Sequence, residues 1–263
     1  MATALITGAS AGLGLEFAWQ LATARHDVVL VARDRERLDR LAGQLRAAAG
    51  VRAEVIAADL ADREAVERVA ERLRDRDRPV GLVVNNAGFG LGEPFVGGDL
   101  ELHERALDVM VRAVMVLSHA AVGPMVERGR GAVLNVSSVA ALTAMGTYSA
   151  HKAWVRSFTE ALAVELRGTG VTATALCPGL VHTEFHDRAG LERDAYPELA
   201  WLNADAVVTA ALADVRRGAV ISTPSLRYGV VAEVARLLPR AAIRALSGDR
   251  RLREAVVNDE AAD

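Results

Sequence analysis

The sequence has very little cysteine, few aromatic residues and no marked excess of either charge. Its single cysteine, Cys177, cannot form an intrachain disulfide, which predicts a reducing, cytoplasmic location. The formal net charge of −3 provides no basic face, so we expect no nucleic-acid partner. No uncharged apolar run reaches the ~18 residues that cross a bilayer. We also expect no signal peptide, because the first apolar strand begins about three residues into the chain.

Apolar strand-like runs alternate with helical patterns along the chain, which indicates parallel βαβ units. Hydrophobic residues make up 51% of the chain, enough to bury one large core. We therefore predict an α/β fold: a Rossmann-type, doubly wound parallel sheet of about seven strands flanked by helices, in a single domain over 1–263. The predicted strands are 4–6, 28–31, 54–57, 81–84, 132–136, 171–176 and 218–222. The predicted helices are 15–24, 34–49, 62–76, 102–126 and 148–167.

Three segments near the C-terminus depart from this alternation. Residues 184–203 are irregular and contain aromatic side chains, which predicts a lid over a substrate pocket. Residues 225–247 predict an apolar helical extension with spaced arginines, suited to cover the cleft, pair with another subunit or touch a membrane. Because its charges are few, we expect packing against protein rather than membrane contact. Residues 258–263 are predicted to be disordered.

Three spaced glycines follow the first strand, in the run TGASAGLG. Gly8 permits a tight turn, Gly12 lets the backbone approach a pyrophosphate, and Gly14 lets the following helix pack close to the strand. The N–H groups and the dipole of that helix start favour phosphate. This arrangement predicts a dinucleotide-binding loop.

Three polar side chains are placed to act together at one edge of the predicted sheet. Tyr148 and Lys152 lie four residues apart on one face of a helix, and Ser138 follows the fifth strand at its carboxyl end. A phenol has an unperturbed pKa near ~10, and a neighbouring ammonium favours the phenolate and lowers that pKa. Ser138 can hydrogen-bond a substrate oxygen and hold it against the Tyr148 hydroxyl. The pattern predicts acid/base chemistry at a carbonyl or alcohol.

With these residues in place, the chain resembles the short-chain dehydrogenase/reductase family, in particular its single-domain bacterial members that prefer NADP(H). The matching motifs are TGASAGLG (7–14), Asp59-Leu60, NNAG (85–88), Ser138 within NVSS, YSAHK (148–152), and Pro178-Gly179 followed by Thr183. The resemblance implies Tyr148 as acid/base, Lys152 as the residue that lowers its pKa and binds the nicotinamide ribose, and Ser138 as the residue that orients the carbonyl. It also implies a homodimer or homotetramer assembled through the helices at 102–126 and 148–167.

The predicted cofactor site combines the glycine loop with positions implied by the resemblance. Asp59 and Leu60 cradle the adenine, the turn from Asn86 lines the cleft, and the turn from Pro178 holds the nicotinamide end. Asn85 is expected to brace the central strand. The cofactor-binding residues are Gly8, Ser10, Gly12, Leu13, Gly14, Arg33, Asp59, Leu60, Asn86, Ala87, Gly88, Tyr148, Lys152, Pro178, Gly179 and Thr183. We expect no metal, since no ligand spacing accompanies the loop histidines His182 and His186.

Two positions depart from the family pattern. Met110 stands where an asparagine usually completes a catalytic tetrad by holding a water that links the lysine to solvent. A methionine side chain cannot hold that water, although the backbone carbonyl can do so if the helix is kinked. His151 replaces a small residue beside Lys152, and we interpret it as a packing histidine rather than a member of the proton path.

The end of the second strand indicates the cofactor. An NAD enzyme needs a carboxylate there to hold the ribose 2′-hydroxyl, and the expected position is Ala32. Arg33 follows and can clamp a 2′-phosphate through its guanidinium group, with Ser10 and Arg37 in support. Asp34 counts slightly against this, unless it caps the next helix. We predict NADP(H) in preference to NAD(H).

These features predict an NADP(H)-dependent oxidoreductase acting on a small-molecule carbonyl or secondary alcohol. Phe89, Phe95, Leu142 and Met145, with the aromatic residues of the lid, predict a mostly apolar pocket for a medium-sized apolar substrate. The alternative is a catalytically weak NADP(H)-binding regulatory protein, which Met110 favours. A third possibility, a lyase or epimerase, is disfavoured because no added acid/base residues are recognisable.

Overall fold

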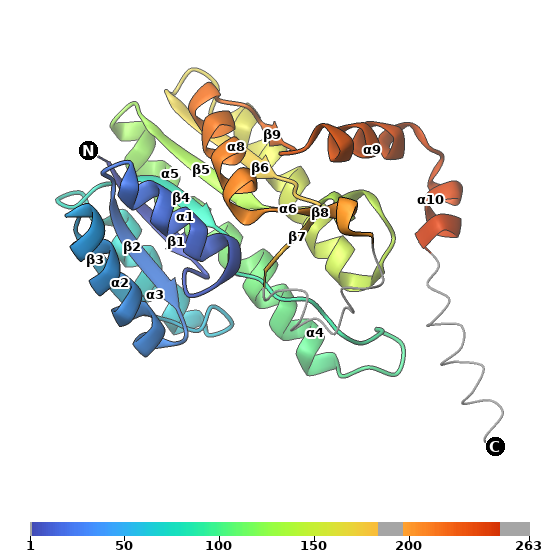
Figure 1. Cartoon of the computed structure of the whole chain (residues 1–263), viewed down its shortest axis with the longest axis horizontal. Helices are drawn as coiled ribbons and strands as arrows, with labels where there is room; N and C mark the ends of the chain where they lie inside the picture. The colour runs from blue at the N-terminus through green and yellow to red at the C-terminus, as the bar shows by residue number, and fades with distance from the viewer. Residues whose placement is uncertain (1, 184–196, 248–263) are drawn as a thin grey trace.

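The computed structural model describes residues 2–183 and 197–247 (Figure 1). Met1, most of the predicted lid and the predicted disordered tail at 258–263 lie outside the described residues. The centre of the molecule is a seven-stranded parallel sheet in the order β3-β2-β1-β4-β5-β6-β9. Its strands are β1 Thr3–Thr7, β2 Asp27–Ala32, β3 Ala53–Ala57, β4 Val80–Asn85, β5 Gly131–Val136, β6 Val171–Leu176 and β9 Ile221–Ser222. The order reverses between β1 and β4, which places a ligand crevice at their carboxyl ends.

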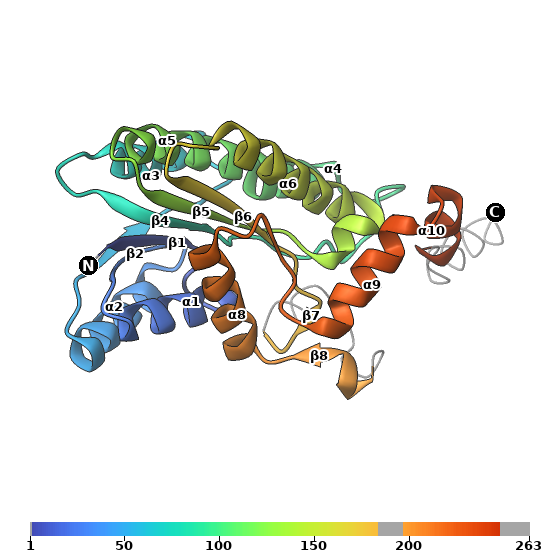
Figure 2. The same cartoon turned by 90° about the horizontal axis from the view of Figure 1, so that it is seen from above.

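Helices cover both faces of this sheet, as the view from above shows (Figure 2). One layer consists of α1 Gly12–Thr23, α2 Arg35–Ala49 and α8 Ala204–Arg217. The opposite layer consists of α3 Arg63–Arg74, α4 Leu100–Leu107, α5 Ala113–Glu127 and α6 Gly146–Glu165. The prediction of a doubly wound Rossmann-type sheet is confirmed.

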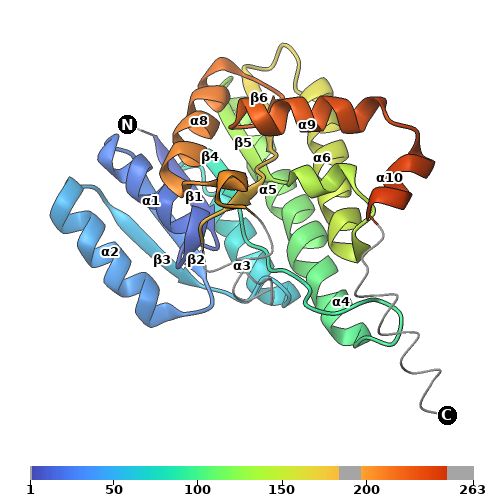
Figure 3. The ribbon, with the colours of Figure 1, turned by 45° about the vertical axis from the view of Figure 1, so that its right-hand side comes forward.

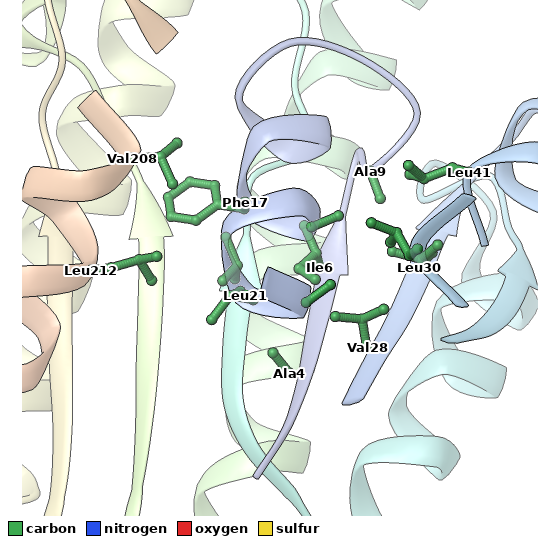
Figure 4. Close-up of a cluster of buried hydrophobic side chains, with 14 of the residues drawn as sticks. Ala4, Ile6, Ala9, Phe17, Leu21, Val28, Leu30, Leu41, Val208 and Leu212 are labelled. Atoms are coloured by element: carbon green, nitrogen blue, oxygen red, sulfur yellow. The ribbon is translucent and has the colours of Figure 1, made fainter. Parts of the chain in front are cut away.

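The first strand shows why the sequence forms a sheet that is buried on both faces. Residues 4–6 are fully buried, and their side chains alternate between the two helical layers. Ile6 packs with Phe17 of α1 in one core, whereas Leu5 joins the core beneath α3 and α5. In the close-up, Phe17 points toward Val208 and Leu212 of α8, so α1 and α8 share one apolar contact (Figure 4).

Local capping chemistry fixes several helix ends where the sequence predicts them. The Asp34 side chain accepts a hydrogen bond from the Arg37 N–H (3.0 Å) and begins α2, which ends at Gly50 in the left-handed conformation (φ 64°). Asp62 caps α3 in the same way, by accepting from the Glu64 N–H at 3.0 Å. Asp34 is therefore a helix cap.

The long helix predicted at 102–126 is interrupted by a wider turn. Between α4 and α5 lies η1, a π-helical segment from Asp108 to Arg112 that contains Met110. The combined helix, Leu100–Glu127, is long and apolar enough to pass a length-and-composition test for a membrane span. However, 56% of its 18-residue window is buried inside the protein, as in a core helix.

Some elements were not anticipated from the sequence. The helix α8 was not predicted, nor was the small parallel pair β7 Leu180–Val181 and β8 Trp201–Leu202. The short 3-10 turn η4 Glu198–Ala200 directly precedes β8. The strand predicted at 218–222 is reduced to Ile221–Ser222.

The predicted C-terminal extension forms two helices rather than one. They are α9 Leu226–Leu237 and α10 Arg240–Ser247, and Pro239 lies in the break between them. Figure 3 shows α9 leading away from the sheet and α10 beyond it. The extension still contacts the protein near η2 Val139–Leu142: Arg240 Nη1 donates to the Leu142 carbonyl (3.3 Å), and the Ser247 hydroxyl accepts from the Ala144 N–H (3.0 Å).

Candidate active site

Ser138, Tyr148 and Lys152 come together at the carboxyl end of β5, as the sequence predicts. Ser138 is the second residue after the strand, and Tyr148 and Lys152 lie in the first two turns of α6. The side chains of Ser138 and Tyr148 share a hydrogen bond. The Lys152 amine lies 5.7 Å from the centre of the Tyr148 ring. One hydroxyl, one phenol and one amine therefore lie close together at this edge of the sheet.

The electrostatics of this trio differ from the expectation that lysine lowers the pKa of the phenol. Burial raises the pKa of Tyr148 to about 12, and the hydrogen bond with Ser138 only partly opposes this. Burial also lowers the pKa of Lys152 to about 8, against the influence of Cys177. The Lys152 amine donates to the Val136 carbonyl at 2.8 Å. In this structure burial is the larger influence on the phenol, and Tyr148 holds its proton at neutral pH.

Lys152 is held between a strand end and the π-helical turn. The Ser137 hydroxyl donates to the Lys152 carbonyl (2.7 Å), which fixes that turn of α6. A Cβ added at Gly88 would lie 3.4 Å from Met110 Sδ and 3.6 Å from Lys152 Nζ. Met110, which is 1% exposed, thus lies close to the amine. Met110 lies in a π-helical turn, and such turns alter the carbonyl pattern of a helix, which is the kind of irregularity that a backbone water link would need.

The glycine loop has the geometry of a phosphate cradle. Gly8 and Gly12 have positive φ values of 67° and 54°. A Cβ at Gly14 would lie 2.2 Å from the Gly8 carbonyl oxygen, so the helix can approach the strand only with glycine there. No side chain caps the N-terminus of α1, whose N-cap residue is Ala11. These residues fit a bound dinucleotide pyrophosphate.

Thr7 joins this loop to the neighbouring strand end, and sequence reasoning missed it. Its hydroxyl accepts from the N–H groups of Asn86 (2.9 Å) and Ala87 (3.0 Å). The Asn86 side-chain amide donates to the Thr7 carbonyl at 2.9 Å. The two loops predicted to hold the cofactor are therefore locked to each other through a residue of the TGASAGLG motif.

Asn85 braces the centre of the sheet, as expected. Its side-chain amide donates to Asn135 Oδ1 on β5 (2.8 Å) and to Ser118 Oγ on α5 (3.1 Å). Asn135 in turn donates to Thr159 Oγ1 on α6 (3.0 Å). All four side chains are buried. This network, of which the sequence indicated one member, ties the strands that carry the site to both flanking helices.

At the predicted adenine end of the cofactor site, Arg33 is exposed directly after β2. Burial opposes ionisation of Asp59, but the Ala61 N–H and the guanidinium groups of Arg105 and Arg33 hold its pKa below the usual value. Arg105 Nη2 lies 2.5 Å from Asp59 Oδ2, a partner that the sequence did not indicate. The Leu60 side chain is buried in the core rather than open to the crevice.

The turn predicted to hold the nicotinamide rests on a residue from the C-terminal extension. A Cβ at Gly179 would lie 2.0 Å from the Tyr228 ring, so the backbone can approach the ring this closely only with glycine at this position. The Tyr228 hydroxyl accepts from the Leu180 N–H (3.2 Å) and donates to the Ala200 carbonyl (2.7 Å). The Pro178 carbonyl accepts a hydrogen bond from the Val139 N–H at 3.0 Å. Tyr228 is a positioning residue that sequence reasoning missed.

The remaining predicted positions fall around this centre. Thr183 lies against Gly12, since a Cβ added at Gly12 would lie 3.4 Å from the Thr183 Cβ. Ser10 and Leu13 are half-buried in the glycine loop. His151 is buried, its Nδ1 has no hydrogen-bond partner among residues 2–183 and 197–247, and burial, then Lys152 and His103, lower its pKa. A neutral packing histidine remains our interpretation.

A cavity of about 220 Å³ opens beside Ser138. It lies between η2, α6, the ends of β6 and β9, and α9. Its lining residues are Ser138, Val139, Leu142, Arg156, Cys177, Ile221, Thr223, Gly229, Ala232, Glu233 and Arg236. Among the apolar residues expected around the pocket, Leu142 lines this cavity, whereas Phe95 and Met145 are exposed. The lid residues Phe185 and Tyr196, and the loop residue His186, lie outside the described residues.

Comparison with known proteins identifies the relatives of this arrangement. The family model for short chain dehydrogenase matches residues 2–194. A short chain dehydrogenase from Pseudocercospora fijiensis is 36% identical over 187 residues, which cover 69% of this chain and 60% of that protein. The NADP-dependent 3-hydroxy acid dehydrogenase YdfG from Salmonella typhi is 35% identical over 186 residues, which cover 69% of this chain and 73% of that protein.

A similar solved structure is a short-chain dehydrogenase from Sphingobium yanoikuyae in complex with NADPH. It superimposes with a TM-score of 0.83 at 35% sequence identity, covering 90% of this chain and 94% of that one. The similarity therefore extends beyond residue 194, where the match to the family model ends.

Proposed function

Since the chain belongs to the short-chain dehydrogenase/reductase family and is thus an NAD(P)-dependent oxidoreductase, we propose that it transfers hydride between NADP(H) and a carbonyl or secondary alcohol. The observation that carries this proposal is the convergence of Ser138, Tyr148 and Lys152 at the carboxyl end of β5. That edge of the sheet is where ligands bind in doubly wound folds.

Each side chain then has a distinct task. When bound, the nicotinamide supplies or accepts the hydride. Ser138 donates a hydrogen bond to the substrate oxygen and aligns it with the phenol. Tyr148, which is protonated at neutral pH, protonates that oxygen during reduction. Lys152 supplies positive charge below its pKa of about 8 and stabilises the phenolate that results.

The preference for NADP(H) over NAD(H) rests on the end of β2. Asp34 is occupied as the N-cap of α2, so it is not placed as a ribose-binding carboxylate. Arg33 is exposed next to it and close enough to Asp59 to influence its titration. A guanidinium at this position suits a 2′-phosphate. The relatives that bind NADPH or depend on NADP support the same choice.

For the substrate, we propose a medium-sized, mostly apolar carbonyl compound. Val139, Leu142 and Ile221 provide apolar walls to the cavity beside Ser138. A panel of ketones, followed by NADPH oxidation at 340 nm, tests the proposal. We expect turnover by the wild-type protein and a loss of at least about a hundredfold in the Tyr148→Phe variant.

A second candidate function is a regulatory protein that binds NADP(H) with little turnover. Met110 favours it, because its side chain cannot hold the water of the usual tetrad. Fluorescence titration with NADPH beside the ketone panel separates the two functions. Tight binding without turnover on any ketone favours the regulator.

We further propose a cytoplasmic homodimer or homotetramer. Leu107, Met115 and Val126 are exposed along α4 and α5, and Val164 is exposed on α6. Apolar side chains in such positions suit helix packing between subunits. Size-exclusion chromatography with light scattering tests the assembly, and a monomer at micromolar concentration contradicts it.

A further inference from the structure

The cavity beside Ser138 contains charge that the proposed hydride transfer does not use. Ser138 and Val139 line one side, next to the reacting groups. Arg156, one helical turn beyond Lys152, lines another, and Glu233 and Arg236 of α9 complete it. Through Ser138, one member of the predicted catalytic trio, the cavity therefore connects that trio to a group of ionic side chains.

Arg156 is the central member of this group. Its side chain is only 13% exposed, and its Nε is buried without a hydrogen-bond partner among the described residues. The carboxylate of Glu160 lies 3.9 Å from that Nε, beyond hydrogen-bonding distance, and is itself half-exposed. A buried donor without an acceptor is unfavourable, so a ligand that supplies an acceptor gains from meeting it.

The other ionisable groups of the cavity leave this positive charge in place. Glu233 accepts a hydrogen bond from Arg236 Nη1 at 3.0 Å, so these two neutralise each other. Burial raises the pKa of Cys177, although Arg156 opposes this, and the thiol is therefore neutral at pH 7. Arg156 has an ion pair with the half-exposed Glu160, but its buried Nε keeps a hydrogen-bonding capacity that no described residue uses.

We propose that Arg156 binds the acidic end of the substrate, a carboxylate, while the carbonyl carbon lies at Ser138 and Tyr148. This inference rests on the proposed function and narrows it: the preferred substrates are oxo acids and the matching hydroxy acids. The apolar chain between the two groups lies along Val139, Leu142 and Ile221. The planar guanidinium group suits a carboxylate because it can donate two parallel hydrogen bonds.

Kinetics with matched substrates test this assignment. Linear oxo acids of four to eight carbons are compared with their methyl esters, which keep the carbonyl and lose the charge. We expect kcat/KM for the best acid to fall about 10- to 100-fold in Arg156→Gln, with little change for its ester. Arg156→Lys should retain part of the preference. Arg167→Gln, which removes an exposed charge at the end of the same helix, should change neither.

A binding measurement separates this inference from the proposed function. Hexanoate and 1-hexanol are titrated calorimetrically into the NADP⁺ complex of the wild-type and Arg156→Gln proteins. We expect hexanoate to bind the variant at least about tenfold more weakly and hexanol to bind both equally. Arg156-dependent hexanoate binding without turnover on any ketone supports this site and contradicts the proposed function. Turnover of neutral ketones, with no preference for acids and no effect of Arg156→Gln or Arg156→Lys, overturns the acid site alone.

Discussion

Replacing Lys152 with methionine should relieve a pH-dependent cost that the folded protein carries. Burial lowers the pKa of Lys152 from 10.5 to about 8. Between those values the unfolded chain binds more protons than the folded one, so the free energy of unfolding of the wild type rises with pH there. Methionine has a similar length and does not titrate, so its variant lacks this dependence.

The size of the effect follows from the shift. One pKa unit corresponds to ~1.4 kcal/mol, so the charged amine destabilises the folded protein by about 3 kcal/mol below pH 8 and by less than about 1 kcal/mol at pH 10. The variant also loses the hydrogen bond to the Val136 carbonyl, a cost of about 1 kcal/mol that does not vary with pH. The stability of the variant relative to the wild type should therefore fall by about 2–3 kcal/mol between pH 7 and pH 10.

Urea unfolding of both cofactor-free proteins at pH 7, 8, 9 and 10 measures this difference, and other titrating groups cancel in it. Lys152 is the only lysine in the sequence, so reductive ¹³C-methylation labels its amine and the α-amino group alone and gives an independent titration by NMR. A stability difference that is constant with pH, together with an amine that titrates near 10.5, would refute the reasoning.

Three further variants probe the cofactor site and the glycine loop. Arg33→Ala should raise the KM for NADPH about 10- to 100-fold and leave the KM for NADH nearly unchanged; equal effects on both cofactors contradict the NADP(H) assignment. Met110→Asn should raise kcat at unchanged KM for NADPH, and a loss of turnover shows that the methionine is no handicap. Gly14→Ala should lower the free energy of unfolding by about 2–3 kcal/mol because its Cβ meets the Gly8 carbonyl, whereas the control Gly43→Ala, with nothing within 4 Å, should stabilise α2 by about 0.5–1 kcal/mol.

The sequence is most informative where one residue determines local structure. Asp34 and Gly50 mark both ends of α2, because a side-chain cap and a left-handed glycine act within a few residues. Ser138, Tyr148 and Lys152 could be placed together because strand ends and helix faces obey simple geometry.

Features that depend on distant contacts were not accessible in this way. The π-helical turn at Met110 and the pairing of Asp59 with Arg105 depend on how helices pack against the sheet. The raised pKa of Tyr148 also depends on tertiary burial, which the sequence does not specify locally. Helix α8 carries comparable signals, Asn203 at its start and Gly218 at its end, but these were not recognised beside the irregular segment that precedes it.

Tyr228 couples the C-terminal extension to the turn that follows β6. Its ring occupies the volume that any side chain at 179 would need, and its hydroxyl bridges the backbone of β7 to the turn before β8. A chain truncated after Leu238 keeps this wedge, whereas one truncated before Tyr228 exposes the underside of Gly179 to water. Tyr228 thus supports the turn predicted to hold the nicotinamide, and none of these contacts involves a residue beyond Leu238.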